Sequence, residues 1–333
     1  MRKLLLLCII AFYQLYSYSA ILVDGINYSI ISENELRVWR LPEGYYKGDI
    51  VIPSHVTYND KTYTVTEVQM FAFNDCTELT SIELPNTITK LPNQVFSRCT
   101  NLVKVKLPNT LIEIPSATFI HCSSLRSIYV PKSVMNIEAG SCFNFCYGLE
   151  EIIVDSDNEC YKDINGVLYD KNETRLLKYP SAKSMNSYKI KESVTVIGIG
   201  AFASCKSLES VVIPESITQI EDEAFVECKN LKNIESFIKV PFLISKNVFN
   251  EVNKETAILK VPKGTKKLYA ATNYWNQFKN IIEVSSSDIE LVNNYKDEII
   301  NSYFLNGMRA NIEMKGIKIV KTKNGKTYKL FKH

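Results

Sequence analysis

The sequence CTELTSIELP at residues 76–85 returns as CTNLVKVKLP at residues 99–108 and as CSSLRSIYVP at residues 122–131. The shared pattern is a cysteine, then an alternation of apolar and polar residues that ends at a proline. Alternation turns one face of a short strand inward, because successive side chains of a strand point in opposite directions. Proline ends the strand, since it offers no N–H to a neighbouring strand. Each copy therefore predicts one short strand.

The cysteine of this pattern recurs along most of the chain, at separations of 23, 23, 24, 59 and 23 residues. A phenylalanine stands three residues before each of these cysteines. A period in the twenties is typical of a leucine-rich repeat solenoid, in which each repeat forms one coil and neighbouring coils shield the apolar residues. The predicted repeat core comprises Phe73, Phe96, Phe119, Phe143, Phe202 and Phe225 together with Cys76, Cys99, Cys122, Cys146, Cys205 and Cys228.

The predicted fold is thus an α/β repeat: a leucine-rich repeat solenoid with a parallel β ladder, helical turns and β-hairpin caps. The separation of 59 residues indicates an insertion at residues 155–190. Within it, residues 164–180 predict two short strands around a polar turn, a hairpin that projects from the solenoid. Residues 24–41 and 56–65 predict hairpins that cover the first coil, and residues 258–284 predict a strand and a short helix that cover the last.

The regular spacing of the cysteines predicts a packing role. Metal binding needs ligands that converge on one point, whereas one cysteine per coil gives a row along the axis with no row of histidines beside it. We therefore expect small apolar side chains in tight turns, and no metal or cofactor. Disulfides between neighbouring coils stay open, because the coil spacing falls within disulfide range and exported proteins are oxidised. Cys142 and Cys160, which fall outside the row, are further candidates.

The first residues have the pattern of a secretory signal. Two basic residues precede an apolar run at residues 4–12, and Ser17 and Ser19 fit a cleavage before Ala20. The run is too short to span a bilayer, and no later apolar stretch is long enough. We expect residues 1–19 to be a signal peptide, and the mature chain to be secreted or held on the outer cell surface without a transmembrane segment.

Charge is distributed unevenly along the chain. Residues 303–333 hold eight basic residues and one acid, whereas the chain between the signal and this tail has 29 basic and 35 acidic residues. The polar stretch SSSD at residues 285–288 marks a linker. We predict a solenoid with its caps at residues 20–284, a linker at 285–301 and a basic β module at 302–333. An exported chain meets little nucleic acid, so we expect no such partner despite the basic tail.

The motifs resemble those of the BspA-like leucine-rich repeat family of bacterial surface proteins. The likeness extends over residues 24–284 and includes GDIVIPSHVTYNDKTYTVTEV at the start, INGVLYDK in the insertion, and VPKG with WNQF at the end. The resemblance implies an exported protein that adheres to host matrix proteins, host cells or other bacteria. The last residues, YFLNGMRANIEMKGIKIVKTKNGKTYKLFKH, resemble a C-terminal sorting domain of type IX secretion through LNG, KGIKIV and a final basic strand.

The sequence offers little for catalysis. It holds three histidines, His55, His121 and His333, and no nucleophile elbow, phosphate loop or paired-histidine metal motif. GIGAFA at residues 198–203 fits a dinucleotide-binding pattern, but it falls within a repeat turn and no long helix follows it. We therefore expect a protein without enzymatic activity.

The outward side chains of stacked strands form one continuous surface, which favours binding. Tyr129, Ile153 and Val212 are predicted to make an exposed apolar stripe, bordered by Lys104 and Lys106, that engages a protein partner. A solvated sheet with incidental apolar residues is the alternative, because single exposed apolar side chains are common.

A glycan is the second class of ligand that the sequence leaves open. Sugar rings pack on exposed aromatic side chains, for which Tyr45, Tyr46, Tyr169 and Tyr179 are the candidates.

Overall fold

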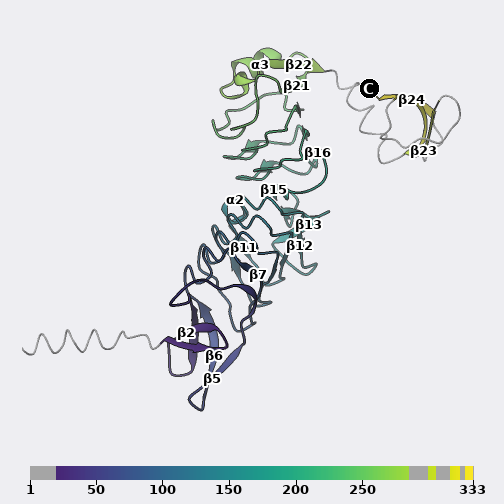
Figure 1. Cartoon of the computed structure of the whole chain (residues 1–333). Helices are drawn as coiled ribbons and strands as arrows, with labels where there is room; N and C mark the ends of the chain where they lie inside the picture. The colour runs from purple at the N-terminus through teal and green to yellow at the C-terminus, as the bar shows by residue number, and fades with distance from the viewer. Residues whose placement is uncertain (1–19, 285–298, 305–315, 323–326, 333) are drawn as a thin grey trace, which may run out of the picture.

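The structure, a computed structural model, is a solenoid of stacked coils (Figure 1). It describes residues 20–284, 299–304, 316–322 and 327–332. The coils run from a small sheet at the N-terminal end to a short helical segment at the other end (Figure 1).

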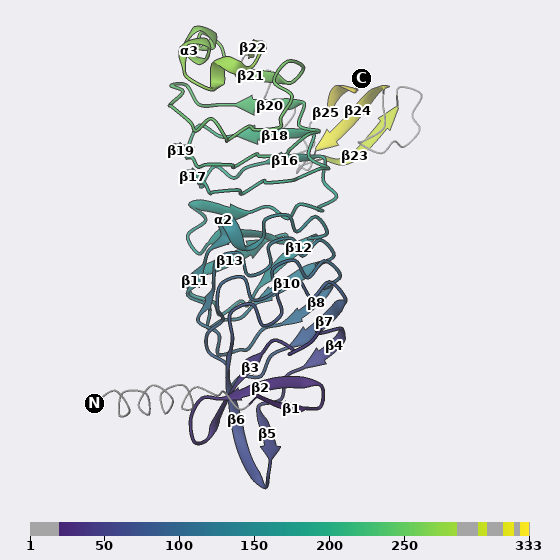
Figure 2. The same cartoon turned by 60° about the vertical axis from the view of Figure 1, so that its left-hand side comes forward.

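Short parallel strands line one side of the coils (Figure 2). Ahead of the insertion, β4 (Gly48–Val51), β7 (Leu79–Glu83) and β8 (Lys104–Lys106) form one sheet, and β10 (Ser127–Val130) pairs with β12 (Glu151–Val154). Beyond it, one sheet holds β16 (Ser187–Lys189), β18 (Ser210–Ile213), β20 (Asn233–Ser236), β21 (Ile258–Pro262) and β22 (Asn280–Val284). All these pairings are parallel, which confirms the predicted ladder.

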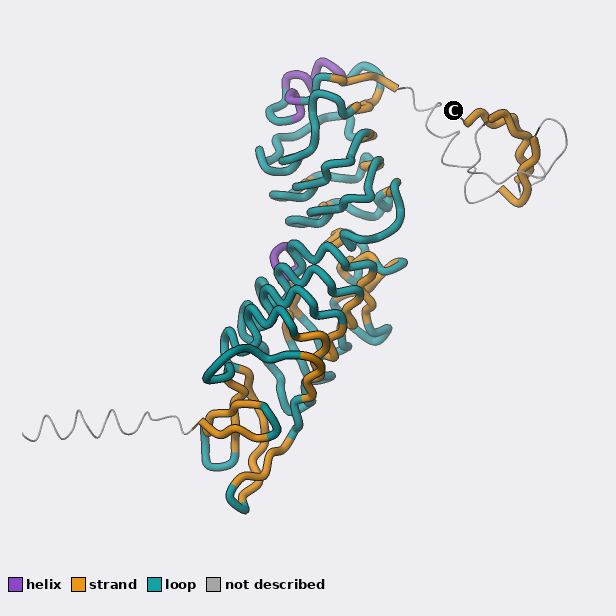
Figure 3. Tube along the Cα trace, viewed as in Figure 1, coloured by secondary structure: helices purple, strands orange, loops and turns teal. Residues whose placement is uncertain are grey.

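The remainder of each coil is turn and very short strand (Figure 3). Two-residue strands pair in parallel along a second line: β9 (Glu113–Ile114) with β11 (Asn136–Ile137), and β17 (Val196–Ile197) with β19 (Gln219–Ile220). In the turns that carry the phenylalanines, the only α-helix among the described residues is α2 (Ala139–Cys142). The predicted helical turns are therefore mostly single turns. A residue in the left-handed region precedes most cysteines of the row, such as Arg98 with φ 60°, and this conformation stops a helix.

The predicted phenylalanines form a stacked column in the core. The ring centroids of Phe96 and Phe119 lie 5.7 Å apart, those of Phe119 and Phe143 6.0 Å, and those of Phe202 and Phe225 4.8 Å. All six phenylalanines and all six cysteines of the predicted repeat core are buried. Each coil thus covers the apolar side chains of its neighbour, and burial of each phenylalanine contributes about 1.5–3 kcal/mol.

Both ends of the solenoid are covered as the sequence predicts. The N-terminal sheet has the order β1 (Ala20–Val23), β2 (Ile26–Ile30), β3 (Glu35–Trp39), β6 (Lys61–Val68) and β5 (His55–Tyr58). Its β2–β3 and β5–β6 pairs are the predicted antiparallel hairpins. At the other end, α3 (Lys266–Ala271) and the 3-10 helix η1 (Trp275–Gln277) follow β21. Trp275 is fully buried, with its ring 5.5 Å from that of Phe249, and closes the aromatic column.

The insertion joins the solenoid more closely than the sequence predicts. Its strands are β13 (Tyr161–Ile164), β14 (Val167–Asp170) and β15 (Arg175–Lys178), of which β14 and β15 form the predicted hairpin. The hairpin does not simply project, because β15 also pairs in parallel with β17 of the next coil. The pairing places the buried Leu176 in register with the buried Ile197, so the hairpin supplies part of a coil. The buried apolar residues form two clusters that meet at this insertion.

The described residues of the basic C-terminal segment form three strands, β23 (Ile299–Phe304), β24 (Gly316–Thr322) and β25 (Thr327–Lys332), in one antiparallel sheet. β23 begins inside the segment predicted as a linker. The predicted signal peptide at residues 1–19 lies outside the described residues. Among the residues that are described, no helix has the length and apolar character needed to cross a membrane.

Candidate binding surface

The outward side chains of the first ladder stand in continuous rows. Val51, Glu83 and Lys106 are in register on β4, β7 and β8. Tyr129 and Ile153 are in register on β10 and β12. The residues between them face the core, since Ile82, Val105, Ile128 and Ile152 are all buried.

Two of the three predicted stripe residues are exposed side by side. Tyr129 is 44% exposed and Ile153 is 40% exposed. The Tyr129 hydroxyl donates a hydrogen bond of 2.6 Å to Oδ2 of Asp155. This bond lowers the pKa of the Asp155 carboxyl and raises the pKa of the Tyr129 hydroxyl. The contact fixes the direction of the Tyr129 ring on the surface.

The predicted lysines lie beside these residues. Lys106 Nζ donates a hydrogen bond of 2.5 Å to Oε1 of Glu83, and both side chains are exposed. Lys104 is exposed in the neighbouring row, in register with Ser81. Ser81 donates a hydrogen bond of 2.6 Å to Asp49, and this bond lowers the pKa of the Asp49 carboxyl. The face therefore offers an apolar patch next to positive charge.

The exposure predicted for Val212 is wrong. Val212 is only 7% exposed and lies on β18, in a different sheet from Tyr129 and Ile153. Its partners in register are Lys189 and Glu235, whose longer side chains flank it. The structure therefore places Tyr129 and Ile153 side by side, with Lys104 and Lys106 on the neighbouring strand β8, and places Val212 apart from them.

Of the four tyrosines considered for glycan binding, only Tyr45 is available at the surface, with 57% exposure. Tyr46, Tyr169 and Tyr179 are buried. Tyr46 packs at a tilt against Phe73 at the start of the aromatic column, and Tyr179 stacks on Phe202 at the insertion. The hydroxyl of Tyr169 forms a hydrogen bond with that of Tyr188. These three residues stabilise the core and cannot serve as surface platforms.

The cysteine row is held by hydrogen bonds between coils. Sγ of Cys99, Cys122, Cys146 and Cys228 each donates to the carbonyl oxygen of the phenylalanine in the preceding coil, at 3.0 Å. All eight described cysteines, Cys142 and Cys160 included, are free thiols. Burial raises the pKa of the Cys146 thiol to about 12. The thiols thus act as packed hydrogen-bond donors.

We expect iodoacetamide at pH 8 to alkylate Cys160 much faster than Cys122 in the native protein. A thiol reacts as the thiolate, and Cys122 is buried with a raised pKa, whereas Cys160 is partly exposed. Peptide mass spectrometry after timed quenching measures both rates, and urea should abolish the difference. Equal native rates at the two sites would contradict the packing role.

A buried lysine is the residue that sequence reasoning missed. Lys178 is 1% exposed and precedes Tyr179, just as Cys142 precedes Phe143 and Ala201 precedes Phe202. Its Nζ donates a hydrogen bond of 2.8 Å to the carbonyl oxygen of Gly200, and burial lowers its pKa. Aligning Tyr179 with the phenylalanine column would have placed Lys178 in a core position.

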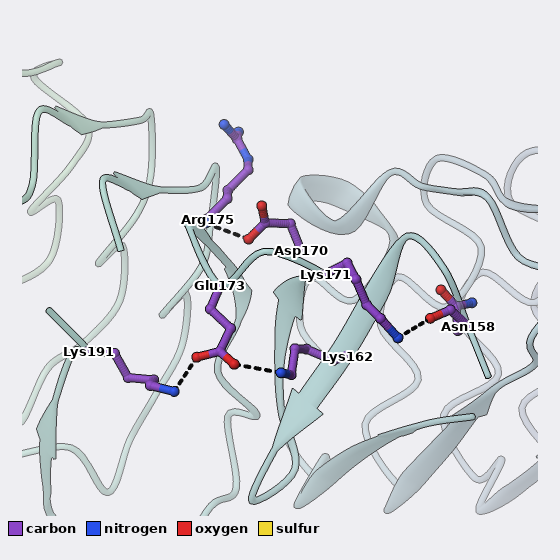
Figure 4. A network of polar contacts seen from close by, with 7 residues as sticks. All are labelled: Asn158, Lys162, Asp170, Lys171, Glu173, Arg175 and Lys191. Atoms are coloured by element: carbon purple, nitrogen blue, oxygen red, sulfur yellow. Dashed lines mark hydrogen bonds and ion pairs between the residues drawn. The ribbon is translucent and has the colours of Figure 1, made fainter. Parts of the chain in front are cut away.

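A polar network fastens the insertion to the solenoid (Figure 4). The carboxylate of Glu173 accepts hydrogen bonds from Lys162 on β13, at 2.5 Å, and from Lys191 beyond the hairpin. These two bonds lower the pKa of the Glu173 carboxyl. Asp170 Oδ1 accepts a hydrogen bond of 2.6 Å from the backbone N–H of Arg175, which closes the hairpin turn. The Glu173 carboxylate is already paired with two lysines, so this network has a structural role: it holds the hairpin turn to the segments on either side.

His121 and Cys122 are adjacent in the chain, but they do not form a base and nucleophile pair. The His121 ring stacks on Phe145 with centroids 4.4 Å apart, and Sγ of Cys122 is turned toward the Phe96 carbonyl. In the described part of the chain, no group of three histidine, cysteine, aspartate or glutamate side chains is placed to hold a metal ion.

Comparison with known protein families identifies the repeat. Six copies of the BspA type leucine rich repeat region match residues 53–164 and 179–295. The chain belongs to this family. The match spans both parts of the solenoid and omits the hairpin of β14 and β15 between them.

Solved structures with a related fold come from several bacteria. The pneumococcal vaccine antigen PcpA is 18% identical, with a TM-score of 0.46 over 80% of this chain and 99% of that one. A leucine-rich repeat protein from Eubacterium ventriosum is 21% identical, with a TM-score of 0.45 over 73% and 78%. One from Bacteroides ovatus is 21% identical, with a TM-score of 0.44 over 80% and 71%. Comparison with curated protein sequences gives no match.

Proposed function

We propose that this BspA-type repeat protein is an exported, non-enzymatic binding protein of the bacterial surface, with an adhesin-like role. Its partner is a protein of the host matrix, of a host cell or of another bacterium. The observation that carries the proposal is the exposed pair Tyr129 and Ile153 on β10 and β12, with Lys104 and Lys106 on the neighbouring strand β8. Tyrosine side chains are common anchors in protein interfaces.

The chemistry of this face supports binding with a small loss of conformational entropy. The strands are fixed by parallel pairing, and the side chains of Tyr129 and Lys106 are each held by a carboxylate of the same face. Surfaces that are ordered before association lose less conformational entropy on binding. The basic C-terminal module, which resembles a type IX sorting domain, serves export or attachment in this proposal.

The proposal is tested by measuring capture of the purified full-length protein by a panel of matrix proteins and by host cells. For each ligand found, Tyr129→Glu and Lys106→Glu are expected to weaken binding by about 10-fold or more, because the first puts a negative charge in the apolar patch and the second replaces a positive charge beside it with a negative one.

Two matched substitutions away from this face serve as controls. Tyr58→Glu changes a tyrosine that is 36% exposed at the end of β5, and Lys239→Glu changes a lysine paired at 2.8 Å with Glu215. Both controls should bind as the unaltered protein does. Unchanged capture of every ligand by the Tyr129 and Lys106 variants would remove this face from consideration.

A further inference from the structure

A second surface feature lies over the turns that carry the phenylalanines. Two hollows of about 320 and 290 Å³ share Phe71, Asn74 and Asp75, so they form one groove. It runs from Tyr45 beside the N-terminal sheet, across two coils, to His121. The helix α2, labelled in Figure 1, occupies the corresponding turn of the next coil.

Aromatic rings stand at both ends of the groove. Tyr45 is 57% exposed at one end, and Phe71 is 45% exposed where the two hollows meet. At the other end the His121 ring stacks on Phe145, with an angle of 6° between their planes. Exposed rings at intervals along a groove offer flat apolar surfaces, on which the C–H face of a sugar ring can pack.

Polar side chains line the groove between these rings. Asn74 and Gln94, which are accessible, carry both hydrogen-bond donors and acceptors. Arg98 and Asp75 form an exposed ion pair at 3.8 Å, and Arg40 also lines the groove. The amide side chains suit hydroxyl groups, which both donate and accept hydrogen bonds.

The backbone under the groove argues against a peptide. The N–H groups of Asp75, Arg98 and His121 donate to carbonyl oxygens of the following coil, at 2.9, 2.8 and 2.9 Å. An extended peptide binds a sheet edge mainly through free main-chain groups. These three N–H groups already form hydrogen bonds between coils, so a ligand in the groove would be bound mainly by side chains.

We propose that the groove binds a neutral oligosaccharide chain, with sugar rings on Tyr45 and Phe71 and hydroxyls on Asn74 and Gln94. Successive coils stack at about 4.8 Å and present equivalent turn positions, which suits a polymer with a repeating unit. The groove shares no residue with the ladder face of Tyr129 and Ile153, so this site is independent of the proposed protein partner.

The test is isothermal titration of the full-length protein with neutral hexasaccharides of β-1,4-linked glucose, N-acetylglucosamine and mannose. At least one should bind, with affinity rising from the disaccharide to the hexasaccharide. Tyr45→Ala should weaken that binding by about 10-fold or more. Tyr58→Ala, which removes a tyrosine outside the groove, should leave it unchanged.

Three results would overturn the site. The first is no binding of any neutral hexasaccharide, and the second is equal affinity for the Tyr45→Ala variant. The third is binding only of a sulfated oligosaccharide of the same length, which would show that charge, and not the aromatic and amide lining, drives recognition. Tyr45→Ala could weaken binding by disturbing the N-terminal sheet. A second variant on another coil, Gln94→Ala, should therefore also weaken binding.

Discussion

Replacing Phe119 with alanine is expected to lower the free energy of unfolding by about 3–5 kcal/mol. Phe119 is fully buried, and its ring lies between those of Phe96 and Phe143, at centroid distances of 5.7 and 6.0 Å. Alanine would remove apolar contacts on both sides and leave a cavity that stacked coils cannot readily close, because each coil is fixed by its neighbours.

Urea denaturation followed by circular dichroism measures this loss. Tyr58→Ala is the control, since Tyr58 is partly exposed on a hairpin, and its effect should stay within about 1 kcal/mol. A loss of less than about 1 kcal/mol for Phe119→Ala would contradict the central place of this ring.

The periodic part of the fold could be predicted because each coil repeats one local rule. Phenylalanine, cysteine and leucine at fixed spacing mark inward positions, and the structure buries all of them. Phe249 and Tyr46 extend the aromatic column at its two ends, where the cysteine is missing from the pattern. Tyr179 extends it within the insertion, where the spacing itself changes.

The candidate surface was harder to predict, because exposure depends on neighbours in space. Tyr129 and Val212 hold equivalent strand positions, yet one is 44% exposed and the other 7%. The sequence cannot show that Val212 stands between Lys189 and Glu235 in a separate sheet. The sequence also cannot show which strand of the insertion pairs with the next coil. The pairing of β15 with β17 is what places Lys178 in the core.

Lys178 is a lysine at a buried position of the repeat that other coils fill with a small side chain. The equivalent positions in neighbouring coils hold Cys142 and Ala201, which are small. Among the described residues, the Lys178 amine has one hydrogen-bond acceptor, the carbonyl of Gly200, whereas a charged lysine has three donors. Burial without an opposing charge is costly, which is why the pKa of Lys178 is lowered.

Replacing Lys178 with methionine is therefore expected to raise the free energy of unfolding by about 1–4 kcal/mol near neutral pH. Methionine keeps the length and apolar stem of the side chain and removes the charge. The Gly200 carbonyl does not lose its last partner, because it also accepts a hydrogen bond of 3.0 Å from the N–H of Ala203.

The gain should depend on pH in a definite direction. The pKa of Lys178 in the folded protein lies below its usual value of 10.5, so between these two values the unfolded chain holds more protons than the folded one. The unaltered protein should therefore gain stability as pH rises through this window, and the advantage of Lys178→Met should shrink.

Urea melts of both proteins across pH 6–11 measure this difference. Lys239→Met is the control, because the Lys239 side chain is 67% exposed and its removal should leave the pH dependence of stability unchanged. If Lys178→Met were less stable than the unaltered protein at neutral pH, Lys178 would stabilise the contact between the insertion and the next coil. Such a result would mean that its ammonium makes more contacts than the Gly200 carbonyl alone, and that the insertion is held to the next coil through charge.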